Sequence, residues 1–406
     1  MSAAGGLDVV TAPNVLHSGE LEELITAIGK GAAERARLDV NPTEAIALIR
    51  NARLGAVALA VSDGGRGAST RELLSLVMDL AEADPDVAHI LRAHFWQEKV
   101  ISRLPAGPRR ERWLDEIRSG MLFGNASSEK GNISAGTASY STTLRRSGQD
   151  YVLDGEKFYS TGTLYSDRIA VSAQVDESTV AYVIVPSDRE GVTIADDWDG
   201  IGQQRTGTGT TRFEHVAVGS DEVVTFRRAT DSPPIGDAAL LQIYLQAIIT
   251  GILRSVVTDA TALIHNRSRT FTHAPAESPA ADPILQEVVG KIASAAYAAE
   301  AAVFAVADTI DAAYRSDQRG APDPGLFAAA SLAAAKAKVH IDEVGLEAAS
   351  ALFEVGGASA ATRSKNLDRH WRNIRTLTLH NPTAYKAVAV GNTVINGAAL
   401  PSNGYF

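Results

Sequence analysis

The sequence predicts an α+β protein in which helical regions at both ends flank a β-rich middle. Three observations predict this arrangement. Apolar residues recur with helical spacing from about 17 to 120, alternating β-rich runs follow to about 225, and long alanine-rich helical patterns begin near 236. The expected domains are an N-terminal helical domain (1–120), a middle β domain (121–228) and a C-terminal helical bundle (229–406).

The bulk composition is that of an ordinary globular protein without cysteine. Hydrophobic residues make up 45% and charged residues 21% of the 406 residues. The net charge of −10 and a pI near 5.4 argue against nucleic acid or an anionic membrane as the main partner. The absence of cysteine excludes disulfides, thiolate metal sites and thiol nucleophiles. The N-terminal residues lack a secretory pattern and no run of about 18 uninterrupted apolar residues occurs, so we expect a soluble cytoplasmic protein.

Helix-start signals organise the N-terminal region. Asn41-Pro42 predicts a cap followed by proline in the first turn, and Ser69 and Glu72 have the spacing of a capping box. Asp84-Pro85 predicts the start of another helix. The inward face of that helix is expected at Val87, Leu91, His94, Glu98 and Ile101.

The middle and C-terminal regions differ sharply in pattern. Asp154-Gly155 between alternating residues predicts a hairpin turn, and RIAVSAQV, TVAYVIVP and TTRFEHVAV are β-rich runs. Three later segments, beginning AALLQIYLQ, PILQEVVGK and LFAAASLAA, carry long alanine-rich patterns. Small residues at this density allow helices to approach closely, as in an antiparallel bundle.

Two stretches of the middle region resemble the flavin-contacting motifs of the acyl-CoA dehydrogenase superfamily. FGNASSEKGNIS (123–134) is similar to the segment that follows the flavin ring edge, and GEKFYSTGTLYSD (155–167) to the strand that stacks on the ring. By themselves these stretches are also consistent with a polar turn and an ordinary β-hairpin. The resemblance implies flavin-binding roles for Asn125, Ser127, Ser128, Ser134 (at the phosphate), Tyr159 (stacking on the ring), Ser160 and Thr161.

A third stretch, DDWDGIGQQRTGTGTTRFEHVAV (196–218), is similar to the family pattern W-x-x-x-G-M-R-G-S-x-T. Trp198, Gly202 and Phe213 keep its frame. The three stretches occur in the order of the family and the resemblance covers nearly the whole chain. It implies an acyl-CoA dehydrogenase-like fold with a middle β-barrel and a C-terminal four-helix bundle. It also implies a homotetramer whose flavin sites use residues of adjacent subunits.

The carboxylate base of acyl-CoA dehydrogenases is missing from its expected places. The usual glutamate position falls on Asn381, whose amide cannot accept the substrate proton. The alternative position falls near Leu241, and no glutamate occurs between Glu222 and Glu277. Asp237 has the character of a helix-start residue. Acyl-CoA dehydrogenation is therefore disfavoured.

The cofactor motif also departs from the FAD-binding pattern. FEVGG (353–357) has Phe353 where FAD-binding members carry glutamine. We therefore expect FMN, taken up in its reduced form, rather than a resident FAD. Since no G-x-G-x-x-G follows a predicted strand, the electrons are expected from a separate NAD(P)H-dependent flavin reductase.

The segment WRNIRTLTLHNPTAYK closely resembles the C-terminal signature of the flavin-dependent monooxygenase branch of the superfamily, which is dibenzothiophene monooxygenase-like. His380 matches the second histidine of the signature, whereas Leu377 and Asn381 replace its first histidine and its aspartate. Enzymes of this branch bind reduced flavin, let O2 add to form a C4a-(hydro)peroxyflavin and shield it from water. The resemblance implies catalytic roles for His94, His380 and Ser160, although a satisfied core histidine is the alternative for His94.

Three basic residues are candidate contacts of the cofactor phosphate: Arg269, Arg375 and Lys386. A surface arginine or ion pairs within the bundle are the alternatives. His370 and Trp371 are interpreted as packing residues, and the nine histidines show no metal-binding spacing, so no metal is expected.

These observations predict the oxygenase component of a two-component flavin-dependent monooxygenase. It would use reduced FMN and O2 on a small organosulfur, aromatic or amine substrate. Two alternatives remain open, an FAD-dependent acyl-CoA dehydrogenase with a relocated base and a non-catalytic flavin-binding bundle protein.

Overall fold

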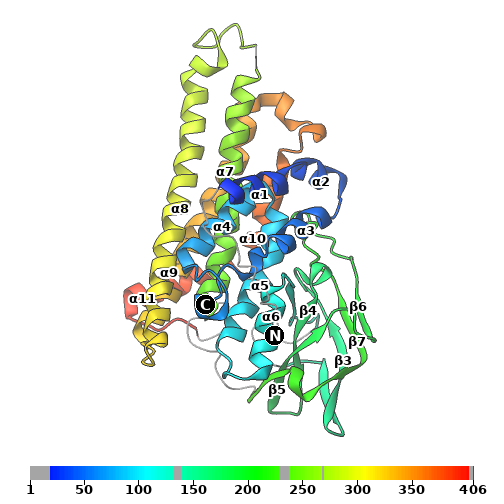
Figure 1. Cartoon of the computed structure of the whole chain (residues 1–406). Coiled ribbons are helices and arrows are strands. Elements are labelled where there is room, and N and C mark those ends of the chain that lie inside the picture. Colours follow the sequence, from blue (N-terminus) through cyan, green and yellow to red (C-terminus); the bar gives the residue numbers. More distant parts are fainter. Residues whose placement is uncertain (1–18, 132–138, 229–236, 268, 402–405) are drawn as a thin grey trace, which may run out of the picture.

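The computed structural model describes residues 19–131, 139–228, 237–267, 269–401 and 406. Helices come first along the chain, a sheet follows, and helices end it (Figure 1). The N-terminal helices are α1 (Gly19–Gly29), α2 (Ala32–Leu38), α3 (Thr43–Asn51), α4 (Thr70–Ala83), α5 (Pro85–Ser102) and α6 (Pro108–Arg118). The strands are β1 (Phe123–Ala126), β2 (Thr143–Ser147), β3 (Asp150–Lys157), β4 (Arg168–Gln174), β5 (Thr179–Pro186), β6 (Val192–Ile194), β7 (Thr211–Val218) and β8 (Val223–Arg228). The C-terminal helices are α7 (Asp237–His265), α8 (Pro283–Gln318), α9 (Pro324–Gly356), α10 (Asp368–Thr378) and α11 (Thr383–Asn396).

Two of the predicted helix starts are confirmed. Ser69 and Glu72 form a reciprocal capping box at α4, and the Asp84 carboxylate accepts hydrogen bonds from two backbone N–H groups at the start of α5. The prediction at Asn41 was wrong. The Asn41 side chain caps no helix and instead accepts a hydrogen bond from the Tyr165 hydroxyl at 2.9 Å. It thereby ties the helical region to the β region.

The inward face predicted for α5 is also confirmed. Val87, Leu91, His94, Glu98 and Ile101 are all buried. The helix therefore lies between the hydrophobic core that it shares with the bundle and strand β1. This central position is what allows α5 to contribute polar groups to a site between domains.

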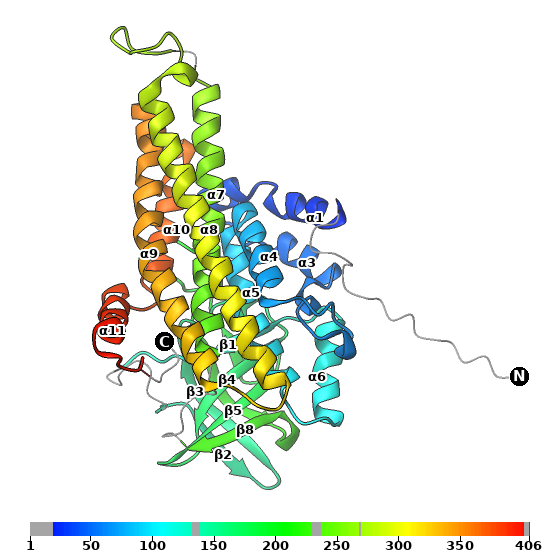
Figure 2. The ribbon, with the colours of Figure 1, turned by 90° about the vertical axis from the view of Figure 1, so that its left-hand side faces the viewer.

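The eight strands form one sheet in the order β6-β7-β3-β2-β4-β5-β8, with β1 beside β4. β2 and β4 share only one paired position, Thr143 with Gln174, so the sheet is nearly divided at its centre. Among the described strands, β6 and β8 pair with β7 and β5 but not with each other, so hydrogen bonds do not close the expected barrel. Figure 2 shows the sheet below the long helices.

The hairpin turn predicted at Asp154-Gly155 was wrong. Both residues lie inside β3, where the pairing with β7 shifts register between Leu153 and Gly155. Gly155 has φ 146°, and a Cβ there would lie 2.5 Å from the Thr142 Cα. Glycine can adopt this positive φ in a β-bulge as well as in a turn, so the sequence signal did not distinguish the two.

The C-terminal region is built on three long helices with α10 as a shorter fourth (Figure 2). α4 packs closely against α7 because Gly251 has no side chain. A Cβ at Gly251 would lie 2.4 Å from the Met78 carbonyl oxygen. One hydrophobic core consequently runs from the N-terminal helices into the bundle.

Two of the described helices, α7 and α8, are long and apolar enough to cross a membrane by length and composition. The apolar part of α7 is 78% buried inside the protein, so the bundle core accounts for its hydropathy. The corresponding part of α8 is only 22% buried, and Tyr297 on this helix is 78% exposed. On α11, Val388 and Ile395 are also exposed. We call these exposed apolar parts of α8 and α11 together the apolar outer face.

Candidate active site

Helix α5 meets the start of α7 and the link between α10 and α11 at one place. The Arg92 guanidinium on α5 donates through Nε and a terminal nitrogen to the Leu241 carbonyl oxygen, at 3.1 and 3.0 Å. The next residue, Gln242, accepts a hydrogen bond from Asn381 Nδ2 at 2.6 Å. Two consecutive residues of α7 therefore bring α5 beside the segment that carries His380.

The β region reaches the same place through two glycines. A Cβ on Gly162 would lie 2.5 Å from the Ile90 carbonyl oxygen of α5, so the backbone after β3 lies directly on this helix. A Cβ on Gly202 would lie 2.1 Å from the Arg372 carbonyl oxygen of α10. The site is therefore assembled from all three regions of the chain.

The predicted flavin-contacting residues of the β region lie together around β1. Asn125 N–H donates to Thr163 Oγ1 at 3.1 Å, and Ser127 Oγ donates to Asn125 Oδ1 at 2.9 Å. The Ser128 carbonyl oxygen accepts a hydrogen bond from Phe158 N–H at 2.8 Å, which joins this segment to the end of β3. Ser134 lies outside the described residues.

Tyr159 has an unusual backbone for an aromatic residue. Its φ is 58°, in the left-handed region, which is a costly conformation for a bulky side chain. The residue is 52% exposed, and its ring stands edge-on to those of Phe158 and Trp198, with centroids 4.6 and 5.9 Å away. An exposed aromatic face held by a strained backbone suits stacking on a planar ligand.

Ser160 and Thr161 follow Tyr159 and present hydroxyl groups. Ser160 is fully buried, and its Oγ has no hydrogen-bond partner within the described part of the chain. Thr161 Oγ1 lies 2.8 Å from Thr208 Oγ1, which lies 2.6 Å from Thr206 Oγ1. A buried hydroxyl without a partner beside an exposed aromatic ring fits a cofactor that has ring carbonyls and nitrogens, such as a flavin.

A buried ion pair between Lys157 and Glu129 stabilises this segment. Lys157 is fully buried, and its Nζ lies 2.6 Å from Glu129 Oε1. Burial opposes the charge of Glu129, but hydrogen bonds from Lys157, Ser141 and Thr142 outweigh it and lower the pKa of Glu129 to about 2. Burial lowers the pKa of Lys157 to about 8, so both groups are charged at neutral pH.

Replacing Glu129 with glutamine is expected to lower the unfolding free energy at pH 7 by about 2 kcal/mol, the typical worth of a hydrogen bond to a charged group. The folded-state pKa of about 2 lies below the usual 4.5, so this contribution is present above pH 4.5 and is lost as the pH falls toward 2. Urea unfolding of both proteins at pH 7, 4.5 and 3 tests this. A difference that stays constant with pH would contradict it.

His94 has both ring nitrogens bonded to the backbone. Nδ1 accepts from Phe123 N–H at 3.2 Å, so Nε2 carries the proton and donates to the Gly55 carbonyl oxygen at 2.9 Å. Burial lowers the pKa of His94 to about 4, so the ring is neutral. This geometry supports a positioning role between α5, β1 and the segment at Gly55. The predicted catalytic role stays a prediction.

His380 lies in the link between α10 and α11. Part of the residue is exposed to solvent, but many protein atoms lie around its ring and displace water from it. This crowding, together with the nearby Arg92 and His89, lowers the pKa of His380 well below its usual range. A neutral imidazole at this point can both accept and donate a proton.

An ion pair on α9 fixes both ends of the link that carries His380. Lys338 Nζ lies 2.7 Å from Asp342 Oδ2, and both side chains are buried. Lys338 also donates to the Thr378 carbonyl oxygen at the end of α10, at 3.2 Å. Asp342 accepts a hydrogen bond from the Thr383 hydroxyl at the start of α11. The pair therefore determines where the link lies.

The three candidate phosphate contacts do not converge in one chain. Arg269 is exposed beyond the far end of α7, about 35 Å along this helix from Leu241 at 1.5 Å per residue. Lys386 is buried, with Nζ 3.8 Å from the ring centroid of Phe406, and burial together with Lys338 lowers its pKa to about 7. Arg375 is half-buried on α10.

Sequence patterns missed three polar residues of the site, His89, Arg92 and Gln203. His89 Nδ1 lies 2.9 Å from Gln203 Oε1, and both side chains are buried. Asp86, His89 and Arg92 recur every three residues on α5, so this polar stripe was a detectable signal. His370 is a packing residue as interpreted, since it is buried with Nε2 2.8 Å from Asp259 Oδ2, but the same interpretation was wrong for Trp371, which is exposed.

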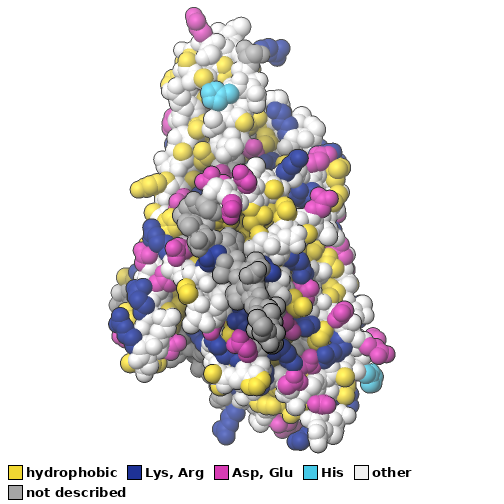
Figure 3. Space-filling view, viewed as in Figure 1, with side chains coloured by type: hydrophobic (Ala, Val, Ile, Leu, Met, Phe, Trp, Pro, Cys, Tyr) yellow, Lys and Arg dark blue, Asp and Glu magenta, His cyan; other side chains and the backbone are white. Residues whose placement is uncertain are grey.

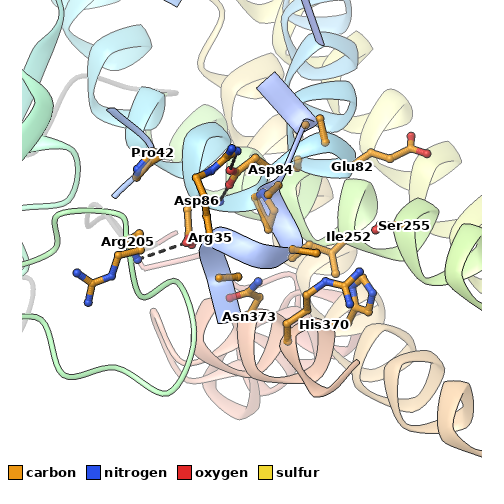
Figure 4. A pocket seen from close by; sticks show the side chains of 18 of the residues that line it. Arg35, Pro42, Glu82, Asp84, Asp86, Arg205, Ile252, Ser255, His370 and Asn373 are labelled. Atoms are coloured by element: carbon orange, nitrogen blue, oxygen red, sulfur yellow. Dashed lines mark hydrogen bonds and ion pairs between the residues drawn. The ribbon is translucent and has the colours of Figure 1, made fainter. Parts of the chain in front are cut away.

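A cavity of about 150 Å³ lies between α2, the start of α5, α7 and α10 (Figure 4). Arg35, Asp84 and Asp86 line it, and Asp86 Oδ2 accepts a hydrogen bond from Arg205 N–H at 3.3 Å. Burial and the neighbouring Asp84 raise the pKa of Asp86 to about 7. Among the described lining residues there is none of the predicted site residues, so this cavity is separate from the flavin segment.

Comparison with known proteins identifies the class to which this fold and site belong. Residues 124–216 match the middle domain of acyl-CoA dehydrogenases, and residues 243–385 match an acyl-CoA dehydrogenase C-terminal domain. The chain is 29% identical to a dibenzothiophene monooxygenase of Mycolicibacterium goodii over 405 residues, with 96% of each chain covered. It is 27% identical to a probable FMNH2-dependent monooxygenase, SfnC, of Pseudomonas putida, with 92% and 93% covered.

A solved structure agrees with these relatives. The complex of TdsC from a Paenibacillus species with FMN and indole has a TM-score of 0.87 and 25% identity, and the match covers 96% of this chain and all of that one. The chain belongs to the flavin-dependent monooxygenase branch of the acyl-CoA dehydrogenase superfamily. It is an oxidoreductase of that branch.

Proposed function

We propose that this protein is the oxygenase component of a two-component monooxygenase that uses reduced FMN and O2. The observation that carries the proposal is an amide in place of a base. Asn381 stands where the dehydrogenases carry a glutamate, and its Nδ2 is bonded to Gln242, while His380 lies beside it. The site offers hydrogen-bonding groups and a neutral imidazole rather than a carboxylate base. These groups suit the activation of O2 by a reduced flavin.

Each part of the site has a role in this proposal. Tyr159 stacks on the flavin ring, and Asn125, Ser127, Ser128, Ser160 and Thr161 hold its polar edge. When bound, reduced FMN supplies the electrons that activate O2. His380 transfers a proton to or from the reacting oxygen or the substrate.

The substrate is proposed to be a small organosulfur, aromatic or amine compound. The reduced cofactor comes from a separate NAD(P)H-dependent flavin reductase in the cytoplasm. Figure 3 shows acidic and basic side chains interspersed over one face, without a one-signed field for nucleic acid. The proposed domain bounds are 1–120 for the N-terminal helical domain, 121–228 for the β domain and 229–406 for the bundle.

We also propose a homotetramer. Burial of the apolar outer face of α8 and α11 between subunits would stabilise an assembly. Arg269 at the tip of the bundle would then serve the flavin site of an adjacent subunit, and Arg375 and Lys386 are the remaining candidate phosphate contacts. Sedimentation at several protein concentrations tests the assembly, and a monomer throughout would contradict it.

The test of the function is an anaerobic titration with reduced FMN and reduced FAD, followed by rapid mixing with O2. We expect preference for reduced FMN and slow release of H2O2. Tyr159→Ala is expected to weaken FMN binding about tenfold, within the 1–3 kcal/mol range of aromatic stacking. Phe226→Ala, at an exposed aromatic residue of β8, serves as the control.

Two other results would favour the alternatives. Tight binding of oxidised FAD with bleaching by an acyl-CoA would support a dehydrogenase. A protein that takes up neither flavin would support a non-catalytic bundle protein.

A further inference from the structure

The cavity between α2, the start of α5, α7 and α10 takes no part in the proposed oxygenation (Figure 4). Its volume of about 150 Å³ is that of a cavity able to hold one benzene molecule, so a compound of about six non-hydrogen atoms fits. Ala36, Val40 and Ile252 give the cavity an apolar wall, and charged side chains line it as well. The cavity therefore suits a small molecule that has both an apolar and a polar part.

The charged groups around the cavity are paired, with one exception. Each lining arginine lies close to a carboxylate oxygen, at 2.7, 2.6 and 2.6 Å in the pairs Arg35–Asp84, Arg205–Asp39 and Arg369–Asp259. The lining Glu82 lies 3.9 Å from Arg254, and burial lowers the pKa of the lining His370, which is therefore neutral. Within the described part of the chain, Asp86 has no ion-pair partner, so the cavity carries one uncompensated acidic group.

The hydrogen bonds of Asp86 leave its carboxylate incompletely satisfied. The residue is 8% exposed. Oδ2 accepts a hydrogen bond from Arg205 N–H at 3.3 Å, which is long for this type of bond, and Oδ1 has no partner within the described residues. Burial, followed by the charge of Asp84, raises the pKa of Asp86 to about 7, so the group is partly ionised at neutral pH. A buried carboxylate in this state is stabilised by a cation beside it.

A primary ammonium group suits this carboxylate better than a metal ion. Among the described residues, no group of three or more acidic or histidine side chains could hold a metal. An ammonium group needs only hydrogen-bond acceptors, to which it donates three N–H bonds. The Asp86 carboxylate and the hydroxyl of Ser255, which also lines the cavity, are such acceptors.

We propose that the cavity is a second binding site, which takes a small primary alkylammonium ion. The ammonium group pairs with the Asp86 carboxylate and donates to the Ser255 hydroxyl, and the alkyl group lies against the apolar wall. Asp86 belongs to α5 and Ser255 to α7, so the bound ion links the N-terminal region to the bundle. The site is independent of the proposed oxygenation, since the described lining residues include none of the predicted flavin or catalytic residues.

Thermal unfolding of the full-length protein at pH 8 with methylammonium chloride tests the proposal. A ligand that binds only the folded protein raises Tm along a saturation curve. Sodium chloride and tetramethylammonium chloride at equal ionic strength are the controls. Neither cation donates a hydrogen bond, so we expect no saturable rise with them.

Two matched variants test the role of the carboxylate. Asp86→Asn keeps the size of the side chain but removes its charge. It is expected to weaken methylammonium binding about tenfold or more, the effect of a hydrogen bond to a charged group. Glu177→Gln, at an exposed position between β4 and β5, is expected to leave the binding unchanged.

Two further measurements make the test independent of the folding of one variant. Ser255→Leu leaves the carboxylate in place and fills the cavity, so it is expected to weaken binding by a similar factor. Since the pKa of Asp86 is about 7, the carboxylate form decreases about tenfold between pH 8 and pH 6, while methylammonium stays charged. The affinity of wild type is therefore expected to fall about tenfold over this range.

Two results would overturn the proposal. One is the absence of a saturable rise in Tm with wild type, since Asp86 would then be balanced by a proton alone. The other is a rise that persists in both Asp86→Asn and Ser255→Leu, because the ion would then bind elsewhere. Titration of the same proteins with reduced FMN separates these results from the proposed function. We expect Asp86→Asn to bind reduced FMN as wild type does, so the two proposals can fail independently.

Discussion

Replacing His380 with alanine is expected to lower product formation about a hundredfold or more, with little change in the affinity for reduced FMN. General acid–base groups contribute typically 10² to 10⁴ in rate, and this neutral imidazole is the proposed proton-transfer group of the site. Reduced flavin would still react with O2 in the variant, so H2O2 should replace the oxygenated product. The ratio of product to reduced FMN consumed measures this uncoupling.

The pH dependence gives the same prediction a second readout. The pKa of His380 is lowered well below its usual range, so the neutral form that accepts a proton persists in weakly acidic solution. Activity of wild type should therefore be retained as the pH falls through 6.5. His340→Ala on α9 is the control, since that histidine is exposed. Full coupling in His380→Ala would contradict the assignment.

Replacing Lys338 with methionine is expected to reduce the unfolding free energy by about 3–5 kcal/mol. Asp342 would then be a buried carboxylate without its ionic partner, and breaking a buried pair by removing one member has this cost. The Thr378 carbonyl oxygen would lose its donor as well. Thermal and urea unfolding followed by circular dichroism measures the loss.

The double variant Lys338→Met with Asp342→Leu tests whether the loss of stability comes from the unpaired charge of Asp342. Removing both charges is expected to restore most of the lost stability, because an apolar pair avoids the desolvation cost. Activity is not expected to return, since the link with His380 loses both anchors. Lys336→Met is the control, as Lys336 is exposed on the same helix. A single variant as stable as wild type would refute the prediction.

Local sequence signals predicted two of the three helix starts, and the third failed because Asn41 bonds to Tyr165 instead of capping a helix. The caps at Ser69 and Asp84 depend on residues two or three positions away, and both formed as predicted. Asp154-Gly155 failed because a glycine at a bulge and a glycine in a turn need the same backbone freedom. The pairing partner that decides between them is β7, which lies far along the chain.

The candidate site shows even more clearly that local patterns do not identify contacts with distant segments of the chain. Helical periodicity placed His94 on the buried face, but the carbonyl and N–H groups that occupy its nitrogens come from other segments. His89 was missed because its partner Gln203 is 114 residues away. The motif resemblance supplied Asn125 and Tyr159, whose surroundings in the structure fit the expected role. It also supplied Arg269, which no single chain brings near them.

The separate origins of the two halves of the site have a consequence for how the enzyme can be changed. The groups proposed to face the flavin belong to β1 and the end of β3, whereas the proposed proton-transfer residue, His380, belongs to the link between α10 and α11. Substitutions in this link, or in the Lys338–Asp342 pair that anchors it, can therefore change the proton-transfer step while the groups of the β region remain in place. The two functions can evolve separately, and a mutant library confined to the link is the economical way to change the chemistry without rebuilding the cofactor site.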